Sequence, residues 1–236
     1  MDVLARLSLF SPPDYIAVAM LLLLWVGSTR LIEHSPKSRP STSSLMAAYR
    51  REWMVQFVTR QPRIFDSQIV GQLRQGTAFF ASGSMIAIGG GLALLGNTER
   101  LRGLAQDLTQ QSDPMVVWEI KVFVMLAFAV NAFLKFVWSH RLFGYCAVLM
   151  ASVPNETEDP SALPRAAKAG EINILAARGY NRGLRSVYFG IAATAWLAGP
   201  WALMIATLFT AAVILRREFA SQSREVLLAQ GDRTQS

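Results

Sequence analysis

The first residues that could do chemistry lie in one long apolar stretch, residues 116–153. At about 100° of rotation per residue, Lys121, Asn131 and Lys135 fall in one sector of the predicted helix, and Glu119 points nearly the opposite way. Ionisable groups at membrane depth are costly, and they usually face a bundle interior or a water-filled cavity. This sector is therefore a candidate lining for an ion or solute pathway.

A structural interpretation of the same residues is favoured over the pathway. Lys121 and Lys135 are fourteen residues apart, about 21 Å along a helix, so each lysine can extend its ammonium group to a different membrane surface. Asn131 then serves as a hydrogen-bonding contact between helices.

A second set of polar residues precedes two other apolar runs. The set comprises Asp66, Arg63, Arg74, Arg178, Asn181, Arg182 and Arg185. A guanidinium group binds phosphate or carboxylate through two parallel hydrogen bonds, so a basic mouth at one membrane face would suit a lipid headgroup or an anionic metabolite. The favoured alternative is that these arginines pair with acidic residues and set the orientation in the membrane.

Signatures of catalysis are scarce. His34 and His140 are the only histidines and stand apart from other metal ligands, and Cys146 is the only cysteine. No metalloprotease, phosphate-loop or serine-hydrolase motif is present. We therefore assign no catalytic residue, metal or cofactor, and the sequence leans away from an enzyme, although catalysis by carboxylates needs no such motif.

The composition shows which elements must position these residues. Hydrophobic residues make up 52% of the chain and charged residues only 17%, which favours a membrane protein over a soluble domain. The apolar runs are continuous and about 20 residues long, as helices that cross a bilayer require. The predicted fold class is all-α: a polytopic integral membrane helical bundle of about four transmembrane helices, with two amphipathic cytoplasmic helices.

The predicted segments make up one membrane domain covering residues 1–236. The spans are residues 13–32, which we expect to remain uncleaved, 76–95, 116–138 and 186–215; the amphipathic helices are 45–60 and 165–185, and a charged tail occupies 217–236. In the first amphipathic helix, Arg50, Arg51 and Glu52 are expected away from the apolar face. This helix suits the membrane interface and a packed soluble position equally well.

The last run is the longest, because thirty residues from Ser186 to Leu215 carry no charge. The favoured interpretation is one long tilted span bent at Pro200, and the alternative is a re-entrant hairpin at Gly199-Pro200. The two long connections hold fourteen Lys and Arg, against seven in the remaining extramembrane segments. By the positive-inside rule, four spans then place both termini outside, whereas a hairpin returns the tail to the cytoplasm.

The expected partners follow from composition and from one small-residue pattern. Gly83, Ala87 and Gly91 recur every four residues, which suits close helix packing, including formation of a homo-oligomer. The net charge of +7 is better explained by cytoplasmic loops and anionic lipid headgroups than by nucleic acid, which we do not expect as a partner. The chain is expected to be a multi-pass protein of the cell (inner or plasma) membrane, with the lipid bilayer as its surroundings.

Several separated motifs resemble one known family. They are Arg51-Glu52-Trp53-Met54, Ile64 with Asp66, Phe79-Phe80-Ala81-Ser82, Ile88-Gly89-Gly90, Glu119 and Lys121 with Trp138, Arg141, Tyr145 and Cys146, and Asn173, Ala176, Asn181 to Arg185, Tyr188 and Phe189. Over roughly residues 14–219 the chain is similar to the Domain of Unknown Function 599 family, apart from Val187, where a second aromatic residue is expected. The resemblance implies a multi-span membrane protein of unassigned activity. It also suggests which residues to mutate first: Asp66, Glu119, Arg141, Asn181, Arg182 and Arg185.

Three functions remain open at this stage. A structural or accessory membrane component is favoured. A small transporter or channel would use the face of Lys121, Asn131 and Lys135, and Lys135 would then line a cavity. A membrane enzyme acting on a lipid or an anionic substrate would need Asp66 or Glu119 close to the arginine cluster.

Overall fold

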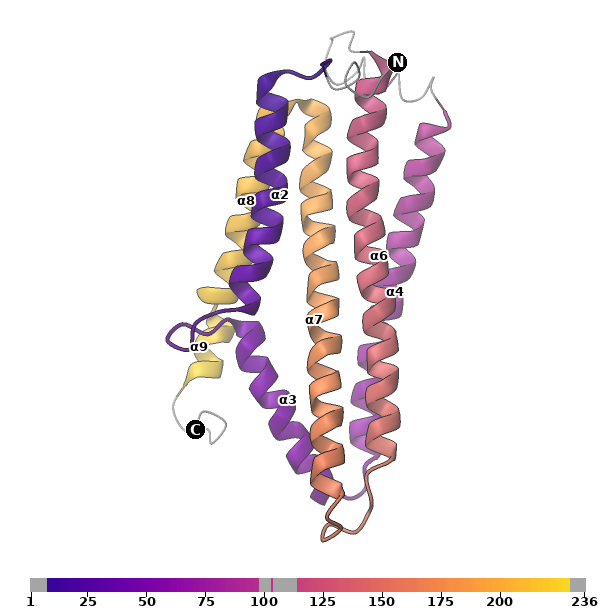
Figure 1. The fold of residues 1–236 in the computed structure, drawn as a ribbon, viewed down its shortest axis with the longest axis vertical. Helices are drawn as coiled ribbons and strands as arrows, with labels where there is room; N and C mark the ends of the chain where they lie inside the picture. Colours follow the sequence, from indigo (N-terminus) through magenta and orange to yellow (C-terminus); the bar gives the residue numbers. More distant parts are fainter. Residues whose placement is uncertain (1–7, 98–102, 104–113, 230–236) are drawn as a thin grey trace. The chain divides into compact units, whose positions relative to one another are not determined.

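The structure is a computed structural model that describes residues 8–97, 103 and 114–229, and these residues contain helices and no strands (Figure 1). The α-helices are α2 (Pro12–Glu33), α3 (Thr42–Thr59), α4 (Ile64–Leu95), α6 (Met115–Ala151), α7 (Ala162–Thr194), α8 (Pro200–Phe219) and α9 (Gln222–Leu228). The predicted all-α class is confirmed. Arg6, Arg100, Arg102 and Arg233, which entered the charge count, lie outside the described residues.

Three of the described helices, α2, α4 and α6, are long and apolar enough to cross a membrane. They contain the first three predicted spans, so the prediction of a helical membrane protein is confirmed. Two boundaries differ. Helix α4 begins at Ile64 rather than near residue 76. Asp66 lies in its first turn, where the helix dipole stabilises a carboxylate. Helix α7 is continuous from Ala162 to Thr194, so the predicted amphipathic segment 165–185 is not a separate helix.

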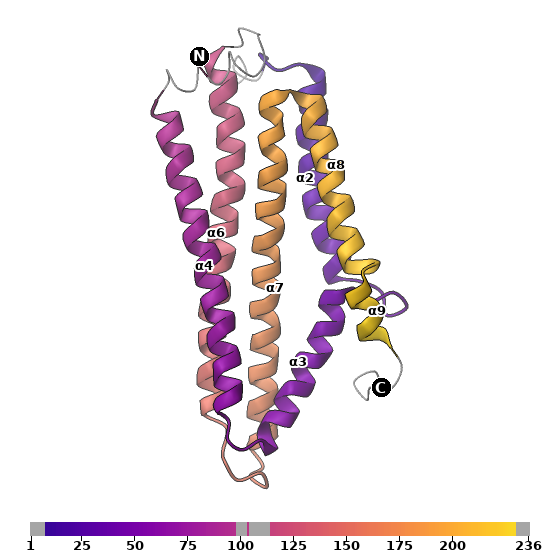
Figure 2. The same cartoon turned by 180° about the vertical axis from the view of Figure 1, so that it is seen from behind.

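The prediction of one long span at residues 186–215 was wrong. Helix α7 ends at Thr194, a 3₁₀ turn covers Ala195–Ala198, and α8 starts at Pro200. Gly199 has φ 113°, a backbone conformation that residues other than glycine rarely adopt. Pro200 follows it at the first position of α8, which suits proline. The chain therefore reverses, and α8 returns alongside α7 as a helical hairpin (Figures 1 and 2).

The hairpin brings the carboxyl-terminal tail back to the first basic connection. The Ser43 backbone N–H and hydroxyl donate to the Glu218 carboxylate at 3.0 and 2.8 Å, and Arg224 Nε donates to the Pro40 carbonyl at 2.9 Å. The prediction that the tail lies on the opposite face from the two long connections is therefore wrong, because the tail and the α2–α3 turn are in contact.

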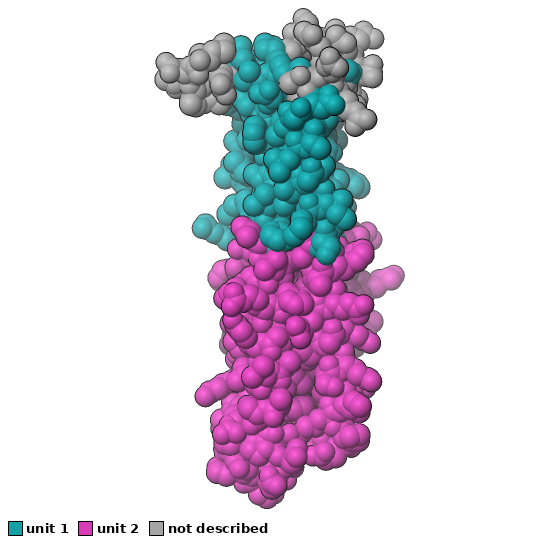
Figure 3. Space-filling model, turned by 90° about the vertical axis from the view of Figure 1, so that its right-hand side faces the viewer, with its two compact units in different colours: residues 1–30, 82–133, 184–215 teal, residues 31–81, 134–183, 216–236 magenta. Residues whose placement is uncertain are grey.

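The chain divides into two compact units, coloured separately in Figure 3. Unit 1 comprises Met1–Arg30, Ser82–Phe133 and Leu184–Leu215, and unit 2 comprises Leu31–Ala81, Leu134–Gly183 and Arg216–Ser236. Unit 2 contains seventeen Lys and Arg against ten Asp and Glu, whereas unit 1 contains six of each. The whole net charge of +7 therefore belongs to unit 2.

In unit 1, the turn between α7 and α8 is attached to the start of α2. Trp196 Nε1 donates to the Asp14 carboxylate at 2.7 Å, and the Trp196 side chain is buried. On α4, a side chain at Gly91 would place its Cβ 2.5 Å from Leu126 Cδ2, whereas nothing lies within 4 Å at Gly83. The predicted small-residue face is thus divided: Gly91 packs within the unit, and Gly83 and Ala87 remain open for the predicted homo-oligomer.

The core of unit 2 joins α3, α4, α6 and α7 through apolar side chains. Its buried members include Met54 and Phe57 of α3, Val70 of α4, Cys146 of α6 and Ala166 of α7. Small residues on α7 permit the close approach, since a Cβ at Gly170 would lie 3.0 Å from Met54 Cγ. This packing fixes α3 against α7, and the cavity described below depends on that contact.

Gly183 of α7 is constrained by close packing against an aromatic ring. A Cβ at this position would lie 2.6 Å from Cε1 of Phe136, a fully buried ring that also contacts the rings of Phe80 and Tyr180. We expect Gly183→Ala to lower the free energy of unfolding by about 1–3 kcal/mol, because overpacking outweighs alanine's helix preference. Thermal unfolding in detergent measures the change.

The matched control is Gly144→Ala on α6, where nothing lies within 4 Å of the added Cβ. This variant should unfold at the same temperature as the wild type or slightly above it. Equal stability of Gly183→Ala and the wild type would contradict the packing described here.

Candidate functional site

The candidate site begins with a pair of contacts between α3 and α7. Arg50 Nη1 donates to Oδ1 of Asn173, a side chain with no exposed surface, and Asn173 Nδ2 donates to Cys146 Sγ at 3.5 Å. The next residue of α3, Arg51, forms an exposed ion pair from Nε to the Glu171 carboxylate at 2.6 Å. Burial lowers the pKa of the Arg50 guanidinium. The contacts hold one edge of that group and leave the rest available.

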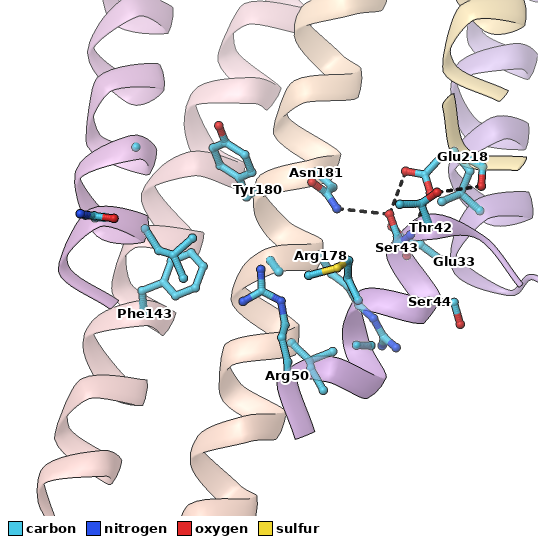
Figure 4. Close-up of a pocket in the computed structure, with 18 residues that line it drawn as sticks. Glu33, Thr42, Ser43, Ser44, Arg50, Phe143, Arg178, Tyr180, Asn181 and Glu218 are labelled. Atoms are coloured by element: carbon cyan, nitrogen blue, oxygen red, sulfur yellow. Dashed lines mark hydrogen bonds between the residues drawn. The ribbon is translucent and has the colours of Figure 1, made fainter. Parts of the chain in front are cut away.

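Arg50 lies on the edge of a cavity of about 430 Å³ within unit 2, which we call cavity A (Figure 4). Its apolar lining includes Ile32, Met46, Ala47, Leu73, Phe143, Ile174 and Ala177, and its polar lining includes Glu33, Thr42, Ser43, Ser44, Arg50, Gln72, Arg178, Tyr180, Asn181 and Glu218. In Figure 4, Phe143 and Tyr180 lie at one end and Ser43 and Glu218 at the other. The cavity therefore combines an apolar part with a hydrogen-bonding part.

Both carboxylates of cavity A already have partners. Glu33 accepts hydrogen bonds from Arg182, one of them from Nε at 2.8 Å, and Glu218 accepts two from Ser43. Asn181 Nδ2 donates to Ser43 Oγ at 3.4 Å, so Asn181 joins this network weakly. Glu33 thus joins the end of α2 to α7, and Glu218 joins the start of α3 to the end of α8.

The two arginines of the cavity, unlike its carboxylates, have unused hydrogen-bonding groups. The described residues supply no hydrogen bond or ion pair to Arg178, whose side chain is exposed, and only Nη1 of Arg50 is used. A guanidinium has five N–H donors in a planar fork. Two arginines with unused donors, beside an apolar lining, can bind the anionic group of an amphipathic molecule and bury part of its hydrocarbon.

The residues of the predicted basic mouth lie in three different places in the structure. Arg178 and Asn181 line cavity A, and Arg182 pairs with Glu33 at its edge. Arg185 belongs to unit 1, where it is 4% exposed and donates from Nε to Thr29 Oγ1 at 3.1 Å. Arg63 and Arg74 line a second cavity of unit 2, which is treated under the further inference.

Asp66 forms structural contacts and lines neither of the two arginine-lined cavities. Its carboxylate is fully buried, and Oδ1 accepts from Trp53 Nε1 at 2.6 Å and from Arg60 Nη1 at 2.5 Å. Oδ2 has no partner among the described residues. Asp66 therefore joins the end of α3 to the start of α4, and the two arginine-lined cavities do not include it.

The polar sector of α6 does not form a continuous pathway in the described structure. Lys121 is 4% exposed and lies over the rings of Trp118 and Trp196, 5.0 and 5.9 Å from their centroids, so the predicted extension to the membrane surface is wrong for this lysine. Asn131 and Lys135 are half-buried. Neither cavity A nor the second arginine-lined cavity includes them.

The remaining candidates lie on the outer parts of α6. Glu119 is half-buried in unit 1. Arg141 is exposed in unit 2, donates to the Tyr145 hydroxyl at 2.9 Å and stacks over the Trp138 and Tyr145 rings. Within the described residues, no group of His, Cys, Asp and Glu is arranged to hold a metal ion.

The sequence interpretation missed Arg50, Ser43 and Glu218. For Arg50 a signal existed: Ala47 and Met54 lie three and four residues away on α3 and are buried, so Arg50 shares their face instead of lying away from it. Ser43 and Glu218 are 175 residues apart, and only the chain reversal at Gly199 brings them together.

Comparisons with known proteins identify one family. The model of the family "Protein of unknown function, DUF599" matches residues 16–223, which is most of the chain. Neither a curated protein nor a solved structure matches it.

Proposed function

The chain belongs to the DUF599 family, whose function is unknown, and we propose that it is an accessory membrane protein that binds an amphipathic anion in cavity A. The apolar helices α2, α4 and α6 are consistent with a membrane protein. The binding role is carried by one observation: Arg50 and Arg178 have unused donors in a cavity that is also lined by apolar side chains.

The proposed orientation rests on length and charge. Residues 12–30 and 115–133 of unit 1 are nineteen residues each, or about 28 Å of helix, close to the roughly 30 Å hydrocarbon core of a bilayer. Unit 2 contains the whole net positive charge, and cytoplasmic segments carry the excess of Lys and Arg. These observations support unit 1 as the part in lipid and unit 2 as the part on the cytoplasmic side.

The ligand class follows from the chemistry of the cavity. Charge-assisted hydrogen bonds from arginine favour carboxylate or phosphate, and the ion pair of Glu33 with Arg182 reduces the repulsion of such a group by that carboxylate. Phe143 and Ile174 provide apolar contact for a hydrocarbon portion. A volume of about 430 Å³ lies within the usual range for sites of small molecules and accommodates a headgroup with part of a chain.

The test compares two variants of α7 that remove the same charge. Arg178→Gln removes a cavity arginine, and Lys168→Gln removes an exposed cation outside both cavities. We expect Arg178→Gln to weaken binding of short-chain phosphatidylglycerol by about tenfold, the loss of one charge-assisted contact, and Lys168→Gln to bind as the wild type does. Calorimetric titration of the full-length protein in neutral detergent gives both affinities.

Short-chain phosphatidylcholine, which has no net charge, is the second probe and should bind more weakly than phosphatidylglycerol to the wild type. Equal losses in the two variants would contradict the proposal, because a general surface charge would then explain binding. Equal affinity for the two lipids would also contradict it.

A further inference from the structure

A second cavity of unit 2, about 530 Å³ in volume, lies along α4 and α6 at the turn that follows α6; we call it cavity B. Three arginines line it: Arg63, Arg74 and Arg165. None of the described residues that line cavity B is an aspartate or a glutamate. This composition differs from that of cavity A, in which two carboxylates accompany the arginines.

Two of these arginines are oriented by backbone carbonyl groups of the turn at residues 152–154. Arg63 Nη1 donates to the Val153 carbonyl at 2.8 Å and Nη2 to the Pro154 carbonyl at 2.8 Å, while Arg165 Nη1 donates to the Ser152 carbonyl at 2.8 Å. Carbonyl groups fix a guanidinium in position without neutralising its charge. The turn therefore holds Arg63 and Arg165 near each other as full cations.

Arg63 also has an unsatisfied donor. Its Nε is buried and has no hydrogen-bond partner among the described residues, although its other nitrogens are used. Its guanidinium lies 4.7 Å from the centroid of the Phe57 ring, which lines the same cavity. An unpaired buried donor costs free energy, and an anion in the cavity could accept from it.

Arg74 contributes a third positive charge from α4. Its Nη2 lies 3.4 Å from His140 Nε2, and His140 Nδ1 lies 3.2 Å from the Arg74 carbonyl. Thr77 Oγ1 also lies 3.3 Å from His140 Nδ1. None of these contacts brings a carboxylate to Arg74, so its positive charge is not compensated by an ion pair within the described residues.

One carboxylate lies close to the cavity without lining it. Hydrogen bonds from the Ser161 side chain and backbone lower the pKa of Asp159, and Arg165 contributes to the same shift. Asp159 thus offsets part of the charge of Arg165 at most, because its Oδ1 is directed to Ser161, from which it accepts both hydrogen bonds, and the residue is not in the lining.

We propose that cavity B is a second anion site, which binds the phosphate group of a phosphate ester between Arg63 and Arg165, with Arg74 attracting the ligand from the other end. Three cations without a carboxylate in the lining favour a ligand with more than one negative charge, and a phosphate monoester has nearly two at neutral pH. A lipid headgroup and a free phosphorylated metabolite both present this phosphate chemistry. This site is independent of the function proposed for cavity A.

The test measures stabilisation of the full-length protein in neutral detergent by two probes, inorganic phosphate and short-chain phosphatidic acid. Chloride at matched ionic strength provides the reference. Both probes should raise the unfolding temperature of the wild type, because a ligand that binds only the folded state stabilises it. Arg165→Gln and Arg74→Gln should each require about tenfold more probe for the same increase, whereas Lys168→Gln, which removes the same charge from α7, should respond as the wild type does.

The outcomes separate the sources of phosphate and the two cavities. A response to both probes indicates that phosphate alone is sufficient, and a response to phosphatidic acid alone indicates a lipid headgroup; either result supports the site. Arg178→Gln, the cavity A variant, should keep the wild-type response, which distinguishes failure of one site from failure of the other. The inference is overturned if neither probe stabilises the protein, or if Arg165→Gln and Arg74→Gln respond as Lys168→Gln does.

Discussion

Replacing Asp66 with alanine is expected to lower the free energy of unfolding by about 2–3 kcal/mol. The Asp66 side chain is completely buried, and its partner Arg60 is 35% exposed, so the loss should be smaller than the roughly 3–5 kcal/mol typical of a fully buried ion pair. The variant also leaves the Trp53 indole N–H without its acceptor. Chemical denaturation of the protein in detergent, followed by tryptophan fluorescence, measures the difference.

Two controls separate the buried carboxylate from a general loss of charge. Glu52→Ala removes a half-buried carboxylate of α3, which accepts only a local hydrogen bond from Gln56, and it should change stability by less than about 0.5 kcal/mol. Trp53→Phe keeps an aromatic ring, although a smaller one, and loses the indole N–H hydrogen bond, which alone costs about 1 kcal/mol. If Asp66→Ala is no less stable than Glu52→Ala, the junction of α3 and α4 does not depend on this carboxylate.

The carboxyl-terminal tail is expected on the same side of the membrane as the α2–α3 turn. A reagent that cannot cross the membrane should therefore label both segments from one side and neither from the other. The physical reason is the reversal at Gly199, which returns α8 to the turn that contains Ser43. Cys146 is the only cysteine and is fully buried, so the native chain should give little background labelling. Single cysteines at Lys37→Cys and Gln222→Cys should therefore react with a membrane-impermeant maleimide from the same side, the cytoplasmic one.

Ser11→Cys, just before α2, is the control for sidedness. Helix α2 separates Ser11 from Lys37, so this cysteine should react from the opposite side. If Gln222→Cys is labelled together with Ser11→Cys and apart from Lys37→Cys, the hairpin is contradicted and the single long span predicted from the sequence is restored.

The sequence could predict the helical class and the first three membrane segments because their signals are local. A predominantly apolar run of about 20 residues is long enough for a spanning helix. For the run from Ser186 to Leu215 the sequence left a bent span and a hairpin at Gly199-Pro200 open, because both arms are apolar, and the positive φ of Gly199 with the chain reversal decides for the hairpin. The contact of Glu218 with Ser43 follows from that reversal and was equally hidden.

The candidate site could be predicted only in part. The basic character near Arg178 and Asn181 is visible in the sequence, because arginines gather before an apolar run. Which arginines keep free donors depends on tertiary partners: Arg182 has Glu33, Arg185 has Thr29, and Arg178 has no described partner. Such assignments need the positions of residues on other helices, and a single sequence does not supply these.

The most direct measurement of the central claim is to locate the bound ligand. Photoreactive phosphatidylglycerol with a diazirine in its acyl chain would be cross-linked to the full-length protein in phosphatidylcholine nanodiscs, and the adducts mapped by mass spectrometry. Binding in cavity A predicts adducts on Met46, Phe143 and Tyr180 that decrease in Arg178→Gln and persist in Lys168→Gln. Adducts confined to outward-facing residues such as Phe79 and Ile191, which are 73% and 63% exposed, and unchanged in Arg178→Gln, would contradict it.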